Sequence, residues 1–270
     1  PRGYARDVDA INVNLDKLLH VNSGVLRAFE TVSKHFLMRF RDKVDVVAVP
    51  WSGGKDSCLS LYRALNEGLE PVCLLNIATR AGEGFRVHGL DPRIILDQAK
   101  ALELPIVQRV ASWESYEQVF KESVKEIKDK LGVEGIVFGD ILLEEHREWA
   151  VKICKELGVK EFSPLYGEDE EKLMKEFMDA GFKAMIVCVK ADNPIEKLLG
   201  RMLNPETMKA LKNAGVDLCG EYGEYHTLVL DGPIFKKRIE IIESRVESIS
   251  SGYRVLDIRR WRLVGKGSRG

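Results

Sequence analysis

Short apolar runs alternate with segments of helical spacing over the first two thirds of the chain. Between the runs, apolar residues such as Leu61 and Leu65 recur at the spacing of an amphipathic helix. The runs are rich in aliphatic and β-branched residues, which is typical of strands buried on both faces, and they cover residues 44–49, 71–77, 104–107 and 135–138. The alternation predicts the α/β class, with a doubly wound parallel sheet.

The same alternation continues through residues 161–163 and 182–189, with a helix expected at 168–180. Asp91-Pro92 is typical of a helix start, because Asp caps the first turn and Pro suits the first helical position. Residues 78–90 contain several glycines and are expected to form a loop. It would lie beyond the carboxyl end of a strand, where open α/β sheets bind ligands.

The pattern changes beyond Ala191. Residues 194–213 are expected to form a broken helix, and 228–230 a strand. Short β-type stretches over 237–264 are separated by Ser250-Ser251-Gly252, which predicts a hairpin. The basic tail, with Arg259, Arg260, Arg262, Lys266 and Arg269, is expected to be a solvated, frayed end.

A polar turn with two glycines separates the first apolar run from the helix after it. Residues 52–57 read Ser-Gly-Gly-Lys-Asp-Ser. Adjacent glycines let the backbone adopt conformations closed to other residues and let a ligand approach. The helix N-terminus adds unpaired N–H groups and a partial positive charge. The turn therefore predicts a phosphate site, although it matches neither a Walker A loop nor Gly-x-Gly-x-x-Gly.

Composition narrows the classes of function. The 270 residues are 45% hydrophobic and 31% charged, which is ample for a packed core. The net charge of −1 gives no electrostatic argument for nucleic acid binding, and no apolar run reaches the ~18 residues of a membrane helix. We therefore expect no membrane partner. The five cysteines form no Cys-x-x-Cys pair, which favours buried thiols in the reducing cytoplasm.

The hexapeptide at 52–57 resembles the PP-loop of the ATP pyrophosphatases, which follow a Ser-Gly-Gly-x-Asp-Ser pattern in the same strand–loop–helix setting. A second dense polar cluster stands at residues 221–227, Glu-Tyr-Gly-Glu-Tyr-His-Thr. With it, the chain resembles the diphthine–ammonia ligase family, the N-type ATP pyrophosphatases. Further positions that carry this resemblance are His88, Gly139-Asp140, His146-Arg147, Leu199-Gly200-Arg201 and the segment 230–235.

The resemblance covers about residues 45–235 and implies a Rossmann-like (HUP-type) fold. The segment before it lies outside the family pattern, and the spacing of its apolar residues is helical. We expect an N-terminal helical extension over residues 1–43, a PP-loop ATP-binding domain over 44–163, and a smaller α+β substrate-binding domain over 164–270. It also implies an amide ligase that adenylates the diphthine carboxylate of a translation elongation factor. Ammonium would then give diphthamide, with release of AMP and pyrophosphate.

Roles for single residues follow from the resemblance and from the chemistry of each side chain. Lys55, Asp56, Glu221 and Glu224 are expected to be catalytic, and Asp56 is also the expected ligand of Mg²⁺. Residues expected to bind ATP are Ser52, Gly53, Gly54, Lys55, Asp56, Ser57, His88, Gly139 and Asp140. Residues expected to bind the acyl substrate are Arg201, Glu221, Tyr222, Gly223, Glu224, Tyr225 and His226. The two tyrosines suit the trimethylammonium group of diphthine, because aromatic faces attract quaternary cations.

Several alternatives stay open on the sequence alone. The protein could be a PP-loop ATP pyrophosphatase that acts on tRNA or on a small-molecule carboxylate, or a nucleotide sensor without catalysis. Residues 221–227 could be a turn with exposed charges, and Arg201 a surface arginine. A homodimer is neither favoured nor excluded.

Overall fold

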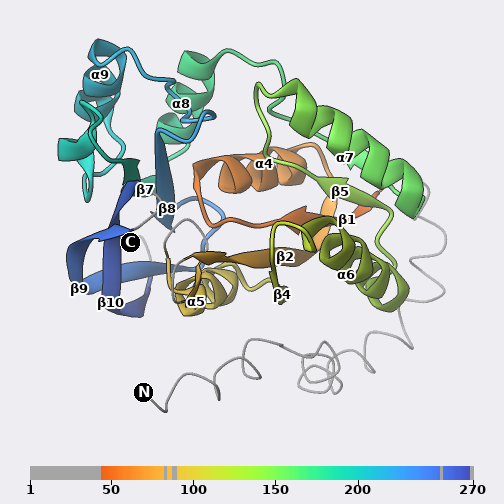
Figure 1. Ribbon diagram of the computed structural model, residues 1–270. Coiled ribbons are helices and arrows are strands. Elements are labelled where there is room, and N and C mark those ends of the chain that lie inside the picture. The colour runs from red at the N-terminus through yellow and green to blue at the C-terminus, as the bar shows by residue number, and fades with distance from the viewer. Residues whose placement is uncertain (1–43, 82–83, 87–89, 250–251, 268–270) are drawn as a thin grey trace.

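The computed structural model describes residues 44–81, 84–86, 90–249 and 252–267 (Figure 1). The expected helical extension over 1–43 and His88 lie outside the described residues. The first of two sheets holds five parallel strands in the order β4-β2-β1-β5-β6, and a short β3 pairs antiparallel with β2. The strands are β1 (Val46–Pro50), β2 (Glu70–Ala81), β3 (Gly84–Arg86), β4 (Ile106–Ala111), β5 (Gly135–Val137) and β6 (Lys160–Phe162).

Helices cover both faces of this sheet. They are α4 (Lys55–Asn66), α5 (Pro92–Leu102), α6 (Tyr116–Leu131) and α7 (Glu144–Leu157). Val47 and Val49 of β1 pack into one apolar cluster with α4 and α5, while Ala48 packs into a second cluster with α6 and α7. Alternate residues of one strand are thus buried on opposite faces. This confirms the doubly wound, Rossmann-like sheet expected from the apolar runs.

A second, antiparallel sheet follows in the order β8-β7-β10-β9. Its strands are β7 (Lys183–Lys190), β8 (Tyr225–Asp231), β9 (Lys237–Ile249) and β10 (Tyr253–Gly265). They are accompanied by α8 (Glu170–Asp179), the 3-10 turn η2 (Glu196–Leu198) and α9 (Pro205–Asn213). Figure 1 shows this sheet at one end of the parallel sheet. None of the helices in the described part of the chain has the length and apolarity needed to cross a membrane.

Three expectations were wrong in detail. The run at 182–189 does not continue the parallel alternation, because β7 pairs antiparallel with β8 and β10. Residues 78–90 are not a plain loop, since β2 extends to Ala81 and folds back on β3. The basic tail is not frayed, because Arg260 and Arg262 lie in β10 and face Glu243 and Glu240 of β9.

The two sheets share one apolar core. The cluster that includes Val47 and Val49 also contains Val187 of β7, Leu228 of β8 and Ile258 of β10. A hydrogen bond from the indole N–H of Trp261 to Asp97, at 2.8 Å, ties β10 to α5. The second sheet therefore packs directly against the layer that carries the glycine turn.

Candidate functional site

The PP-loop (residues 52–57) lies at the point where the order of the parallel strands reverses. Strand β1 is flanked by β2 on one side and β5 on the other. The chain runs from β1 outward to β2 and β4, and then returns to the other side of β1 to form β5 and β6. The loop between β1 and α4 opens at the carboxyl end of β1, beside this switch point. Doubly wound sheets bind their ligands in such a crevice.

Both glycines of the loop are required by close packing. Gly53 has a φ of +81°, and a Cβ there would lie 2.3 Å from Gln98 Oε1. The space that a side chain on Gly53 would occupy is therefore filled by α5 and is not open to a ligand. Gly54 is the N-cap of α4 and makes no side-chain cap hydrogen bond. A Cβ on Gly54 would lie 3.3 Å from the carbonyl oxygen of Thr227 in β8.

Hydroxyl groups line the turn. The Oγ atoms of Ser52 and Ser57 are 3.3 Å apart, and Ser52 Oγ accepts a hydrogen bond from Gly54 N at 3.3 Å. Thr227 Oγ1 accepts from Lys55 N at 3.0 Å, so β8 binds the first amide of α4. The loop is thus assembled from both sheets, and its serines lie together as the sequence predicts.

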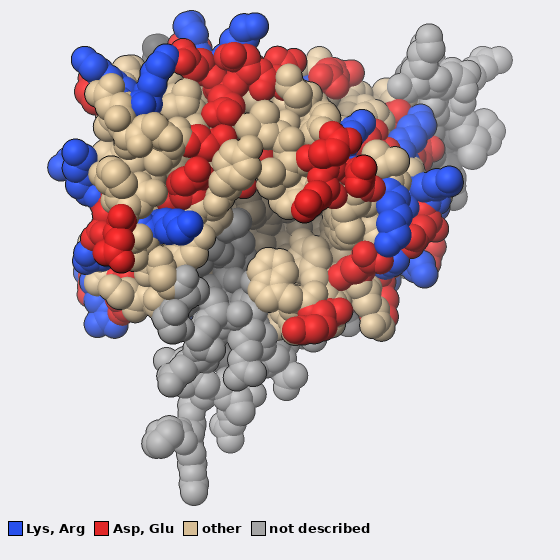
Figure 2. Space-filling model, turned by 45° about the horizontal axis from the view of Figure 1, so that its top comes forward, with Lys and Arg blue, Asp and Glu red and all other residues tan. Residues whose placement is uncertain are grey.

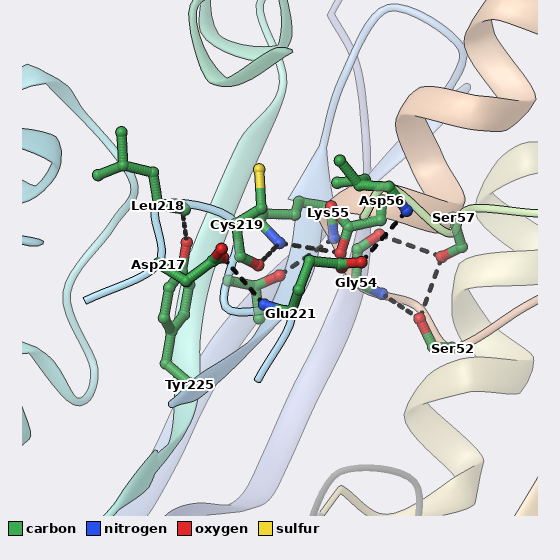
Figure 3. Close-up of polar contacts among 12 residues, drawn as sticks. Ser52, Gly54, Lys55, Asp56, Ser57, Asp217, Leu218, Cys219, Glu221 and Tyr225 are labelled. Carbon is green, nitrogen blue, oxygen red and sulfur yellow. Dashed lines mark hydrogen bonds and ion pairs between the residues drawn. The ribbon is translucent and has the colours of Figure 1, made fainter. Parts of the chain in front are cut away.

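Lys55 takes a different place from the one expected of a phosphate ligand (Figure 3). Its side chain is buried, with Nζ 2.8 Å from Asp56 Oδ2 and hydrogen-bonded to the carbonyl of Cys219. Nζ also lies 5.5 Å from the centroid of the Tyr225 ring. Burial by itself lowers the pKa of Lys55, but the Asp56 carboxylate reverses this and holds the pKa above its usual value. Lys55 is therefore a charged side chain that points into the second half of the molecule.

Glu221 connects the second polar cluster to the loop after β5. Its Oε2 accepts hydrogen bonds from Ile141 N at 3.2 Å and Leu142 N at 3.3 Å. Burial, and then the charge of Asp56, raises the pKa of Glu221, while the two backbone N–H groups and Lys55 oppose this shift. The carboxylate thus reaches the half of the molecule that carries the PP-loop.

Gly139 and Asp140 lie at the same place. A Cβ on Gly139 would come within 3.1 Å of backbone atoms of Asp56 and Ser57, so a side chain here would require this loop and the start of α4 to shift apart by a few tenths of an ångström. Asp140 Oδ1 is 3.0 Å from Nδ1 of His146. The structure therefore brings the residues 139–140 to the PP-loop, as expected, and adds His146 as a neighbour of Asp140.

Tyr222 and Tyr225, both expected to bind the trimethylammonium group, differ in their exposure to solvent. Tyr222 is 66% exposed, whereas Tyr225 is 1% exposed and its hydroxyl donates to the carbonyl of Leu218. The ring of Tyr225 faces Lys55. A residue buried in this way does not offer a second open wall to a trimethylammonium group, so Tyr225 is a packing residue in this conformation.

Among the remaining residues of the expected substrate set, Gly223 and His226 both lie beside Tyr253, whereas Arg201 lies elsewhere. Glu224 has a buried carboxylate oxygen, Oε2, without a hydrogen-bond partner. The ring of His226 lies 6.3 Å from that of Tyr253, and a Cβ on Gly223 would lie 3.1 Å from the Tyr253 hydroxyl. The backbone of Arg201 bonds to Ile186 of β7, and its side chain is exposed. Arg201 is not among the residues that contact the PP-loop.

Sequence reasoning missed the buried polar side chains that hold the loop from behind. Gln98 on α5 donates to the carbonyls of Gly53 and Val229, and it accepts from the indole N–H of Trp51. Asn76 on β2 donates to the Trp51 carbonyl at 2.7 Å. The available signal was a polar residue on an otherwise apolar stripe, which is unusual in a buried position.

Figure 2 shows a hollow in the face that comes forward when the molecule is turned. Asp and Glu side chains gather around it more densely than Lys and Arg. The first turn of α7 carries two exposed acidic side chains, Glu144 and Glu145. A face of this kind is suited to a cationic group rather than to a polyanion.

Comparisons with known proteins agree over nearly the whole described chain. The model of the diphthamide synthase N-terminal domain matches residues 45–161, and that of the diphthamide synthase C-terminal domain matches 169–264. The diphthine–ammonia ligase of Rattus norvegicus is 30% identical over 244 residues, which cover 81% of this chain and 91% of that protein. The human enzyme of the same name is 31% identical over 74% of this chain and 84% of its own length.

The diphthine–ammonia ligase of Schizosaccharomyces pombe is 31% identical over 74% of this chain. The match spans only 37% of the yeast protein, which is therefore much longer than the part it shares with this chain. The mammalian relatives, in contrast, are matched along most of their length. The chain belongs to the diphthine–ammonia ligase family.

Proposed function

We propose that this protein is an ATP-dependent ligase that converts the diphthine of a translation elongation factor into diphthamide, with ammonium as the nitrogen donor. The observation that carries the proposal is the Ser-Gly-Gly-Lys-Asp-Ser loop at the switch point of the sheet, in a chain of this family. A phosphate-binding turn at a helix N-terminus supplies the nucleotide site that such a reaction needs.

The chemistry explains why ATP is consumed. A carboxylate is a poor acylating agent because oxide is a poor leaving group. A carboxylate oxygen of diphthine attacks the α-phosphorus of ATP, the α–β bond breaks, and pyrophosphate leaves. Ammonia then attacks the activated acyl carbon, a proton is lost from nitrogen, and AMP leaves with the electron pair of the broken C–O bond.

Residues at the PP-loop are assigned to the nucleotide. The backbone N–H groups of Gly53 and Gly54 and the hydroxyls of Ser52 and Ser57 would donate to phosphate oxygens, which stabilises the charge that develops on pyrophosphate. Residues 139–140 would line the nucleotide from the β5 side. Lys55 acts through its pair with Asp56, because its ammonium group is already bound there.

Mg²⁺ is the metal that this chemistry implies. Among the residues that the structure describes, no group of three or more His, Cys, Asp and Glu could hold a metal ion. Mg²⁺ in nucleotide sites is commonly held by one or two carboxylates, water and the phosphates themselves. Asp56 fits that limited role, since its side chain is 31% exposed at the start of α4. The ion would supply further charge neutralisation of the leaving group.

The second polar cluster is assigned to the acyl and ammonium side. Glu221 and Glu224 would bind ammonium or take a proton from it, and the exposed ring of Tyr222 is available to the trimethylammonium group. All five cysteines are free and buried, which supports a reducing compartment, the cytoplasm.

Product analysis tests the proposed reaction. The protein is incubated with ATP labelled at the α-phosphate, ammonium and elongation factor that carries diphthine. We expect AMP and pyrophosphate in equal amounts, together with amidated peptide in the mass spectrum. The matched control is elongation factor that lacks diphthine, which should give no AMP above background. ADP as the main product, or AMP without any amide, would contradict the proposal.

A further inference from the structure

The carbonyl of Gly53 is held from two sides. It accepts hydrogen bonds from Gln98 Nε2 and from Val229 N, each at 2.9 Å. Gln98 belongs to α5 and Val229 to β8, so the two donors come from elements far apart in the sequence. The direction of this carbonyl is therefore set by the fold around the loop and not by the loop alone.

The side-chain amide of Gln98 has one usable orientation. Its Oε1 accepts from Trp51 Nε1 at 3.1 Å, and its Nε2 donates to the carbonyls of Gly53 and Val229, the latter at 2.7 Å. An indole N–H can only donate and a backbone carbonyl can only accept, so the reversed amide would lose all three bonds. The side chain is 0% exposed, and solvent does not compete with these partners.

This orientation decides where the next N–H group points. In a planar trans peptide, the C=O of one residue and the N–H of the following residue point in opposite directions. Because the Gly53 carbonyl is turned toward Gln98 and β8, the Gly54 N–H faces the other way. It points to Ser52 Oγ, 3.3 Å away, on the inner side of the PP-loop.

We infer that Gln98 is a positioning residue of the nucleotide site, which turns the Gly53–Gly54 peptide so that the Gly54 N–H faces a bound phosphate. The inference rests on the proposed function in taking ATP as the ligand. Gln98 touches no reacting atom and acts through the backbone of the loop. An apolar residue at this position of α5 would fill the same space but leave the Gly53 carbonyl with one of its two donors, Val229 N, so the peptide would be held less firmly.

Affinity for a non-hydrolysable ATP analogue tests the inference, with isothermal titration calorimetry as the measurement. Gln98→Met keeps the length of the side chain and removes both donors. We expect its Kd to rise about tenfold, in line with the loss of one buried hydrogen bond. Gln98→Glu adds a readout that a packing defect would not give. Its carboxylate would face two carbonyls, whereas the protonated form could donate again, so the ratio of its Kd to that of the wild type should fall as the pH is lowered.

Gln108→Glu is the matched control. Gln108 is 1% exposed and donates to Asn76 Oδ1 and to the Pro92 carbonyl. It does not bond to the PP-loop itself and is connected to it only through Asn76, which donates to the Trp51 carbonyl. It imposes the same burial of a carboxyl group, so we expect a loss of thermal stability but a Kd close to that of the wild type. If the Gln98 variants do not fold, Trp51→Phe decides the matter. It removes the donor that orients Oε1 together with part of a buried ring, but it leaves both amide donors of Gln98 in place, and a smaller rise in Kd is expected.

The outcomes separate this inference from the proposed function. Wild-type protein that does not bind the ATP analogue would overturn both. Binding by the wild type with an unchanged Kd in the Gln98 variants, or in Trp51→Phe where those do not fold, would overturn the positioning role and leave the proposed function standing. Equal losses in Gln98→Glu and Gln108→Glu at every pH would also overturn it, because the effect would then be one of burial.

Discussion

At the scale of single residues, Glu221 performs a task that its place in the sequence does not reveal. One of its oxygens, Oε2, accepts both hydrogen bonds from the loop after β5. With the proposed role toward ammonium, this side chain would combine two tasks, since the oxygen holds the loop while the charge would bind the cation. Substitutions can separate the roles because an amide retains one accepting oxygen.

We expect Glu221→Gln to bind the ATP analogue as the wild type does but to lower the rate of amidation about 10²-fold or more, the usual effect of losing an acid–base group. Glu221→Met should weaken both, because the Ile141 and Leu142 amides lose their acceptor. The measurement is a titration with nucleotide and an amidation assay on each variant. Wild-type amidation by Glu221→Gln would restrict Glu221 to holding the loop.

The pH dependence of the unfolding free energy can be compared between the wild type and Glu221→Gln. Burial raises the pKa of Glu221 above the ordinary value of 4.5, so the folded protein binds this proton more tightly than the unfolded chain. The stability that this group contributes is full below the unfolded pKa and is lost as the pH rises through the folded pKa. Urea unfolding at a series of pH values should therefore show that the unfolding free energy of the wild type falls relative to that of Glu221→Gln as the pH rises from the unfolded pKa through the higher folded pKa.

Lys55 shows the limit of reading a motif residue by residue. The pattern places a lysine in a phosphate-binding turn, which suggests a phosphate ligand. In the structure its ammonium group is occupied by Asp56, a backbone carbonyl and the Tyr225 ring. Asp56 is the next residue in the chain, but the carbonyl belongs to Cys219, 164 residues further on, and the ring belongs to Tyr225 of β8. No local pattern reports such a contact.

At the scale of elements, the loop after β5 touches the N-terminus of α4 without any side chain between them. The touching point is Gly139, where a Cβ would lie 3.1 Å from the backbone carbonyl carbon of Asp56. Backbone atoms of a helix start cannot yield as the end of a flexible side chain would. A larger residue would have to push the two elements apart at the nucleotide site.

We expect Gly139→Ala to raise the Kd for the ATP analogue about tenfold, comparable to the loss of a buried hydrogen bond, with a smaller effect on thermal stability. The control is Gly265→Ala, because a Cβ there meets nothing within 4 Å and the residue is not left-handed. Calorimetry and thermal unfolding on both variants give the comparison. Unchanged affinity in Gly139→Ala would show that the contact does not shape the site.

Local signals predicted the elements better than their pairing. Asp91 caps α5 by accepting from Arg93 N, as expected from the Asp-Pro pair. The run that became β7 was assigned to the wrong sheet, because a strand buried on both faces has the same apolar pattern in a parallel and in an antiparallel sheet. Gln98 and Thr227 were missed as supports of the PP-loop for a similar reason. Their partners are set by tertiary contacts and not by spacing.

At the scale of the whole molecule, the boundary expected near residue 163 stays a prediction, and the packing argues that the two sheets depend on each other. Phe182, just before β7, stacks on Phe177 of α8 with ring centroids 4.8 Å apart, and its edge meets Tyr62 of α4 at 5.6 Å. Arg63 of α4 also binds Glu176 of α8 at 3.0 Å. Helices of the first half are thus anchored in the second.

One core shared by both sheets should unfold in one step. We expect hydrogen exchange in increasing urea to give the same global unfolding free energy for peptides from β1 and β5 as for peptides from β7 and β8. Phe182→Leu should lower that value by about 1–3 kcal/mol in both sets, the range of a core substitution. Its control is Val151→Ala, since Val151 is 45% exposed on α7 and contributes little to the core.

Loss of protection in β7 and β8 alone would mean two independently stable domains, and the nucleotide site would then be completed only when they dock. Equal loss in both sheets would mean that any mutation weakening the second sheet also weakens the PP-loop, since the loop is held by Thr227 and Val229 of β8.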